Sequence, residues 1–302
     1  MKEVVIEMSN EEKSFQKTNI NYYPGHMAKT KRLISENLSL IDVVYEVIDA
    51  RMPKSSKIKD IDDILKDKKR ILIMTKVDLC DINETNKWKN YYEQKGYKVL
   101  LLNLESNDSL NNLVNMTNEI MEEENNKRVS KGMNKKKARV LVIGIPNVGK
   151  STLINRLVHK KVVNVGNKPG VTKNLSWIRV NNDIELLDSP GILWPKLDDE
   201  SIALNLASLT AIKEEVLPID KVSIYILNIL NKYYNEILKN RYGIDHIDED
   251  IEVTLDEIGK RRGCLVRGGI VDYDKVYSII INDIKNGIIK GITFDRYEDK
   301  GD

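Results

Sequence analysis

Cysteine is scarce in this sequence, and its scarcity excludes two structural classes. The 302 residues contain only Cys80 and Cys264, in unrelated contexts, which provide neither a disulfide framework nor the clustered ligands of a zinc site. No apolar run approaches the roughly 20 residues that a membrane span requires. The acid-rich start, with Glu3 and Glu7, lacks the pattern of a signal or transit peptide. The sequence therefore predicts a cytoplasmic protein without a membrane segment.

Acidic residues are absent from one long segment, 125–182. This segment holds fourteen lysines and arginines, whereas the remaining residues carry 34 basic and 46 acidic side chains, so the net charge of +2 conceals an uneven distribution. Such asymmetry favours a polyanionic partner, with nucleic acid as the first candidate. A solvated lysine-rich linker is the alternative, because the apolar pattern fades over residues 125–137 as it does in a connector.

Six short runs rich in aliphatic and β-branched residues predict the strands of one sheet. Polar stretches long enough for helices separate the first four runs, which is typical of an α/β fold with a parallel sheet. The short turn Asn181-Asn182 joins the last two runs as a hairpin. We therefore expect five parallel strands and one antiparallel neighbour, at residues 42–49, 70–76, 98–103, 138–144, 175–180 and 183–188.

After Pro195 the apolar spacing becomes helical, over residues 200–215, 220–240 and 272–287. We expect a smaller all-α domain over residues 198–302, following an α/β domain over residues 21–197. For the acidic leader, residues 1–20, we expect disorder.

The segment GIPNVGKS, residues 144–151, matches the pattern G-x-x-x-x-G-K-[ST] between a strand and a helix. Gly144 and Gly149 let successive N–H groups face phosphate oxygens, and the helix N-terminus adds positive partial charge. Lys150 is expected to reach the β- and γ-phosphates and stabilise charge during catalysis. The Ser151 hydroxyl is expected to hold Mg²⁺.

Two later motifs complete a phosphate site. DSPG follows the last strand, where Asp188 can reach Mg²⁺, directly or through water, and Gly191 can donate its N–H to a γ-phosphate. Thr172, in KPGVTKN, can add a second hydroxyl to Mg²⁺. Either motif alone is an ordinary turn, and their position after residues 144–151 is what indicates γ-phosphate sensing.

TKVD, residues 75–78, follows another strand. Asp78 can accept hydrogen bonds from guanine N1–H and N2–H₂, which adenine cannot supply, and Lys76 can lay its aliphatic stem along the base. The segment predicts guanine recognition, hence GTP and GDP as ligands, with an exposed loop as the alternative.

The order of these motifs is unusual, because TKVD precedes GIPNVGKS. This order resembles that of circularly permuted P-loop GTPases. Four further segments narrow the resemblance to the ribosome biogenesis GTPase A family, also called YlqF. They are YYPGHMAKTKRLI, KEEVLPID, RYGID and KRRGCLVRGGIVDYDK, at residues 22–34, 213–220, 241–245 and 260–275. The resemblance extends from about Asn21 to the last residue.

The resemblance implies a GTPase that binds the large ribosomal subunit precursor, its RNA and ribosomal proteins, promotes a late assembly step, and hydrolyses GTP to leave; no oligomer is expected. Two positions depart from the family: Thr75 replaces the usual Asn, and LNLES, residues 102–106, lacks the usual small serine. The nucleotide contacts implied by position are Thr75, Lys76, Val77, Asp78, Asn103, Leu104, Asn147, Val148, Gly149, Lys150, Ser151, Thr152 and Gly191.

Hydrolysis requires a further group, because Ile192 occupies the position where many GTPases orient water with Gln. The resemblance implies that His26 fulfils this role; a helix cap or an RNA contact are alternatives. It also implies K⁺ beside Asn147, where a cation would stabilise developing charge. Candidate RNA contacts are residues 125–139 and the cations Lys260, Arg261, Arg262 and Arg267.

Two other interpretations remain open. The chain could be a permuted GTPase that acts on another RNA or on the small ribosomal subunit, or a module that holds GTP without turnover.

Overall fold

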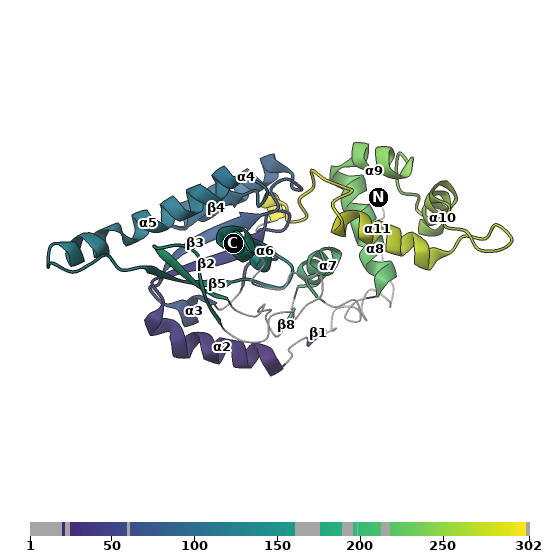
Figure 1. Ribbon diagram of the computed structural model, residues 1–302. Coiled ribbons are helices and arrows are strands. Elements are labelled where there is room, and N and C mark those ends of the chain that lie inside the picture. Colours follow the sequence, from purple (N-terminus) through teal and green to yellow (C-terminus); the bar gives the residue numbers. More distant parts are fainter. Residues whose placement is uncertain are drawn as a thin grey trace, which may run out of the picture.

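The computed structural model shows an α/β part and a helical part side by side (Figure 1). It describes residues 20–21, 25–58, 61–160, 176–188, 196–197, 199–212 and 218–299.

A six-stranded sheet forms the centre of the α/β part. Its spatial order is β4-β3-β2-β5-β7-β6, and every neighbouring pair is parallel except β7 and β6. The predicted fold class, with five parallel strands, one antiparallel neighbour and a permuted order, is confirmed. The strands are β2 (Val43–Asp49), β3 (Lys69–Thr75), β4 (Lys98–Leu102), β5 (Ala138–Ile143), β6 (Ser176–Arg179) and β7 (Ile184–Asp188).

Strand β2 is buried at every one of its residues, Glu46 and Asp49 included, as expected for a strand with a neighbour on each side and helices around the sheet. The helices α4 (Ile82–Gln94) and α5 (Asn107–Val129) pack against β4, and α5 also contacts β5. Helix α6 (Lys150–Val158) packs against β7, while α2 (Gly25–Asn37) and α3 (Ile61–Leu65) contact each other.

The strand order brings distant motifs together. Strands β3, β2 and β5 are consecutive and parallel, so their carboxyl ends lie at one edge of the sheet. TKVD begins at the end of β3, and residues 144–149 follow β5 at that same edge. Thr75 and Val148 are in contact there, although 73 positions separate them in the chain.

Helix α5 is longer than the sequence pattern predicted. We expected a connector over residues 125–137, but the helix continues to Val129, so the connector prediction was wrong for its first five residues. Lys127 pairs with Glu123 one turn earlier, and Lys127 and Arg128 stand in the last turn, where cations interact favourably with the helix dipole. The connector covers residues 130–137, and Figure 1 shows this end of α5 projecting away from the sheet.

The helical part differs from its prediction in detail. The stretch 220–240 was expected to be one helix, but it forms two, which meet at Tyr234 (φ −138°, ψ 44°). The Tyr234 hydroxyl contacts Asp81 and the Thr293 carbonyl, both at 3.2 Å, so tertiary contacts hold this break. The helices are α7 (Glu200–Ser208), α8 (Ile219–Tyr233), α9 (Asn235–Tyr242), α10 (Ile251–Arg262) and α11 (Tyr273–Lys285).

After α11 the chain returns to the α/β part, and we call residues 287–299 the return segment. The Phe294 N–H donates to the Arg51 carbonyl at 2.7 Å, and the indole N–H of Trp88 donates to the Asp295 carbonyl at 2.9 Å. The 3₁₀ turn η3 (Tyr297–Asp299) packs on α4. The return segment therefore holds the helical part against the sheet part.

A small two-stranded sheet pairs β1 (Ile20–Asn21) with β8 (Lys196–Leu197) in antiparallel fashion. Apart from Ile20, the predicted leader 1–20 lies outside the described residues. The domain boundary between residues 197 and 198 remains a prediction.

Candidate functional site

The loop 144–149, between β5 and α6, requires its two glycines. A Cβ at Gly144 would lie 2.4 Å from the Val47 carbonyl oxygen of the neighbouring strand β2, so no larger residue fits. Gly149 has φ +96° and is the N-cap of α6. The first turn of α6 therefore presents its backbone N–H groups at the carboxyl edge of the sheet, where an anion is favoured.

Lys150 begins α6 and folds back over this loop. Its ammonium donates to the carbonyl oxygens of Gly144 at 3.0 Å and Ile145 at 2.8 Å, and the residue is only 8% exposed. Ser151 and Thr152 follow it and are partly exposed. Carbonyl oxygens of the loop thus bind the Lys150 ammonium, and the two hydroxyl side chains are its neighbours in sequence.

Thr75 joins the two motifs. Its hydroxyl lies 2.6 Å from the Val148 carbonyl oxygen and 3.0 Å from that of Ile48, and its single proton can serve one of them at a time. The sequence departure at this position, Thr for Asn, therefore has a structural role. The hydroxyl connects the end of β3 to the loop 144–149, which we call the phosphate-type loop.

Lys76 makes a second tie between these loops. It has a left-handed backbone (φ +59°), which is uncommon for a residue with a side chain. Its ammonium donates to the Asn147 carbonyl at 2.7 Å and pairs with the Asp49 carboxylate at 2.9 Å. The side chain is 24% exposed, so part of its stem can meet a base.

Asp49 stands between two cations, Lys76 and Arg51, and is itself fully buried. Burial by itself raises the pKa of Asp49, but the charges of Arg51 and Lys76 outweigh this, so that the pKa lies well below its usual range. Burial lowers the pKa of Lys76, and Asp49 opposes that shift. Asp49 is therefore ionised near neutral pH.

The remaining residues predicted to read guanine lie nearby. Asp78 is exposed and Val77 is half-buried. Asn103 accepts the Glu105 N–H at 2.8 Å in a turn after β4, and the Leu104 side chain packs beside Gly149. Leu104 also accepts a hydrogen bond at 2.7 Å from Arg156 of α6, so this second base loop is fixed to the phosphate-type loop.

Asn147, the predicted K⁺ ligand, has a left-handed backbone (φ +63°). Its side-chain amide donates to the carbonyl and, at 3.2 Å, to the hydroxyl of Thr210, which follows α7 and is also left-handed (φ +55°). Strained residues of this kind persist where surrounding contacts hold them, and they gather at functional sites.

The predicted Mg²⁺ and γ-phosphate residues are only partly within the described chain. Asp188 ends β7, and its backbone pairs with Val142 near the start of the loop 144–149. His26 stands in the first turn of α2. The side chains of both residues, together with Thr172, Gly191 and Ile192, lie outside the described residues.

Sequence reasoning missed Asp49, Arg51 and Thr210. Asp49 is the last residue of the strand VVYEVID and Arg51 follows it by two positions; an acidic residue at the carboxyl end of a predicted parallel strand is a usable signal. Thr210 carries no sequence signal, because its contact with Asn147 depends on how the segment after α7 folds back.

The comparisons with known proteins agree with this geometry. A family model described as 50S ribosome-binding GTPase matches residues 139–266. The chain is 45% identical over 277 residues to ribosome biogenesis GTPase A of Priestia megaterium, covering 91% of this chain and 96% of that protein. The chain belongs to the ribosome biogenesis GTPase A family. The corresponding protein of Thermotoga maritima is 29% identical over 93% of this chain and 95% of its own length.

Solved structures of this family have the same fold. A GDP-bound YlqF structure superposes with a TM-score of 0.63 at 26% identity, covering 89% of this chain and all of that one. GNP-bound YlqF from T. maritima gives 0.62, with 26% identity and coverage of 89% and 98%. As a member of the ribosome biogenesis GTPase A family, the chain is a GTP hydrolase. No helix within the described ranges is both long and apolar enough to span a bilayer.

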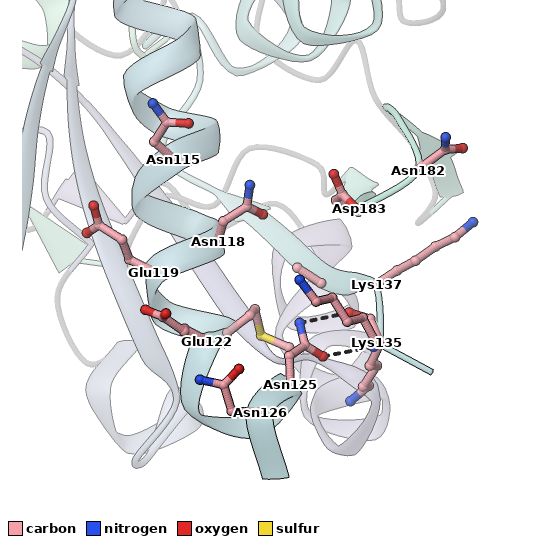
Figure 2. A pocket seen from close by; sticks show the side chains of 13 residues that line it. Asn115, Asn118, Glu119, Glu122, Asn125, Asn126, Lys135, Lys137, Asn182 and Asp183 are labelled. Carbon is pink, nitrogen blue, oxygen red and sulfur yellow. Dashed lines mark hydrogen bonds between the residues drawn. The ribbon is translucent and has the colours of Figure 1, made fainter. Parts of the chain in front are cut away.

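A polar groove lies at the other edge of the sheet, away from the nucleotide motifs. Its cavity volume is about 540 Å³, and α5, residues 135–138 and the β6–β7 turn at Asn182 and Asp183 line it. Figure 2 shows asparagine amides gathered around it, with Asn125 hydrogen-bonded to the backbone of Lys136. Acidic and basic side chains share the lining, so the groove does not resemble a phosphate site.

Proposed function

We propose that this chain binds the precursor of the large ribosomal subunit in its GTP form, promotes a late step of assembly, and leaves after hydrolysing GTP. The contact between the loops at the ends of β3 and β5 carries the nucleotide part of this proposal. Hydrogen bonds join residues 75–78, the guanine-type segment, to residues 144–149, the phosphate-type loop. They run from Thr75 to Val148 and from Lys76 to Asn147. The names of the relatives support the ribosomal part. The proposed site of action is the cytoplasm, with the chain acting as a monomer.

In this proposal each part of the site has one task. Asp78 reads the guanine edge, while Asn103 and Leu104 border the base. The N–H groups from Val148 to Thr152 cradle the phosphates. Lys150 releases its own loop carbonyls and takes the β- and γ-phosphates, where its charge stabilises the transition state. Gly191 senses the γ-phosphate.

Mg²⁺ fits the proposed ligands. Hydroxyl and carboxylate oxygens are the donors that this ion prefers, and Ser151, beside Lys150 at the start of α6, supplies one hydroxyl. Thr172 and Asp188 would complete the set. When bound, the ion neutralises charge on the phosphates.

K⁺ is the second proposed ion. An amide that donates through nitrogen to Thr210 has its oxygen fixed in direction, and this arrangement supports Asn147 as a ligand. GTP turnover compared in KCl and NaCl at equal ionic strength tests this, and equal rates would exclude it.

Two exposed basic regions support RNA binding. At the end of α5, Lys131 and Lys135 of the connector are exposed and form no ion pair within the described chain. In the helical part, Arg262 and Arg267 have no acidic partner among the described residues, whereas the other two predicted cations, Lys260 and Arg261, pair with Asp256 and Glu257 on α10. The unpaired cations are the better RNA candidates, because they need not give up an existing partner.

Sedimentation with purified ribosomal subunits tests the proposed partner. The chain, loaded with a non-hydrolysable GTP analogue, is expected to sediment with precursors of the large subunit and to remain in the supernatant with GDP. The Asp78→Asn variant, which loses guanine recognition, serves as the matched control. Sedimentation with the small subunit alone, or equally with GDP and GTP, would contradict the proposal. Stimulation of turnover by the large subunit separates a switch from a module that only holds GTP.

A further inference from the structure

The carboxylate of Asp49 is the most heavily engaged group beside the nucleotide motifs. Asp49 ends β2 and is the register partner of Thr75, so it lies next to the guanine-type segment. One carboxylate oxygen accepts the Arg51 Nε–H and backbone N–H, both at 3.0 Å. The other lies 2.9 Å from a terminal guanidinium nitrogen of Arg51 and 2.9 Å from Lys76 Nζ. One buried carboxylate thus joins two cations.

Stability alone does not explain this arrangement. Asp49 and the Arg51 side chain are at most 3% exposed, and charges buried to this degree lose their hydration. A well-packed apolar set of similar volume is often as stable as a buried ion pair or more so. The position of Lys76 indicates the purpose instead. Its ammonium is held by two groups, the Asp49 carboxylate and the Asn147 carbonyl. The aliphatic stem is therefore fixed at its far end as well as at the backbone.

We propose that Asp49 is a positioning residue for guanine binding, which holds Lys76 so that its stem is in place to cover the base. The proposal rests on the assignment of TKVD as the guanine-reading segment. Asp49 does not touch the nucleotide itself. It removes rotamer freedom from a long side chain before binding, so that less entropy is lost when the base arrives.

Arg51 connects this device to the helical part. Its guanidinium donates to the Asp49 carboxylate and also, at 3.2 Å, to the Ile284 carbonyl in the last turn of α11. Its own carbonyl accepts the Phe294 N–H of the return segment at 2.7 Å. The end of α11 and the return segment therefore both hold Arg51, and through it the orientation of the carboxylate, so guanine affinity depends on both being docked.

Equilibrium titration of the full chain with fluorescent GDP and a fluorescent non-hydrolysable GTP analogue tests the proposal. Asp49→Asn keeps the shape of the side chain and removes its charge. We expect both affinities to fall by the same factor, at least tenfold, because the base is common to both ligands. For GTP hydrolysis, KM should rise while kcat at saturation stays within threefold of the native value.

A double-mutant comparison separates positioning from a general structural role. Lys76→Met keeps an apolar stem and removes the anchored ammonium. If Asp49 acts through Lys76, Asp49→Asn should cost less than twofold in affinity when added to Lys76→Met. If Asp49→Asn does not fold, as judged by circular dichroism, Asp49→Glu replaces it in both backgrounds. Its expected cost is at least threefold in the native background and less than 1.5-fold beside Lys76→Met.

Two outcomes would overturn the proposal: a folded Asp49 variant that binds both nucleotides within twofold of the native chain, or equal losses in both backgrounds. Titration of the native chain with GTP and with ATP in the same experiment distinguishes failure of the Asp49 proposal from failure of the assignment of TKVD as the guanine-reading segment. A native chain without preference for GTP would remove the role of TKVD as well. A native preference for GTP, with unchanged affinity in the variant, would remove only the role of Asp49.

Discussion

At the scale of single residues, the site depends on contacts that hold side chains in place before any ligand binds. Three residues with left-handed backbones, Lys76, Asn147 and Thr210, follow one another through direct hydrogen bonds. Such conformations cost of order 1–3 kcal/mol each and persist only where neighbours fix them. The guanine-type segment, the phosphate-type loop and the end of α7 are therefore linked at the residues that are strained.

Asp49 also gives the chain a pH-dependent component of stability. Its pKa is lowered in the folded state by Arg51 and Lys76, so its favourable contribution is complete above the unfolded-state value of about 4. The contribution declines as the pH falls from there toward the folded-state pKa. We expect the difference in unfolding free energy between the native chain and Asp49→Asn to be largest at pH 6–7 and smaller at pH 3.5. Urea unfolding at each pH measures it, and a difference independent of pH would contradict the expectation.

His26 is the residue proposed to orient water, and His26→Ala tests that role. We expect GTP affinity within twofold of native and a loss of most subunit-stimulated turnover, because the imidazole acts in hydrolysis rather than in binding. Turnover is measured under saturating GTP with purified large subunits. His246, an exposed histidine of the helical part, provides the control variant His246→Ala, for which native turnover is expected. Native turnover in His26→Ala would remove the idea.

At the scale of elements, the sheet could be predicted from the sequence and the helical part only in outline. Strands such as β2 and β3 consist mostly of aliphatic residues, as burial on both faces favours, so their pattern is readily recognised. The break at Tyr234 could not be predicted, because it depends on contacts with Asp81 and Thr293, which are distant in sequence. The TKVD and GIPNVGKS motifs could be recognised in the sequence, whereas the role of Asp49 could not. Their spacing is local, whereas the role of Asp49 is defined by its neighbours across the sheet.

The packing of α10 on α11 depends on one small residue. A Cβ at Gly259 would lie 2.4 Å from a methyl group of Val271 and 3.2 Å from one of Val276. Gly259→Val is expected to lower the free energy of unfolding by about 1–3 kcal/mol through overpacking. Chemical denaturation measures this. Lys260→Val, on the exposed side of the same helix, introduces the same side chain where there is room for it and is expected to change stability by less than about 0.7 kcal/mol.

At the scale of the whole molecule, the two exposed basic regions lie at opposite ends in Figure 1. One is the connector after α5, and the other is the end of α10 with the loop that follows it. An RNA partner that reaches both would bridge the α/β part and the helical part. A change in how these parts dock would then alter how well both ends fit at once.

The salt dependence of subunit binding tests this two-ended contact. Each phosphate contact that is lost should reduce the slope of log affinity against log salt by about 0.7–0.9. We expect Lys131→Gln with Lys135→Gln, and separately Arg262→Gln with Arg267→Gln, each to reduce the slope by about 1–2. Lys66→Gln, an exposed cation outside both regions, should leave it unchanged. A slope that only one pair alters would restrict RNA contact to that end.

The return segment has a consequence for biosynthesis. The Leu79 carbonyl, directly after TKVD, accepts the N–H groups of Gly291 and Ile292, and the Asp81 N–H donates to the Thr293 hydroxyl. Asp81 is translated 212 residues before Thr293. During translation the guanine-type segment therefore emerges long before the residues that hold it, and a nascent chain that already displays both nucleotide motifs still lacks this support. We therefore expect the proposed guanine site to be complete only after the return segment has left the exit tunnel.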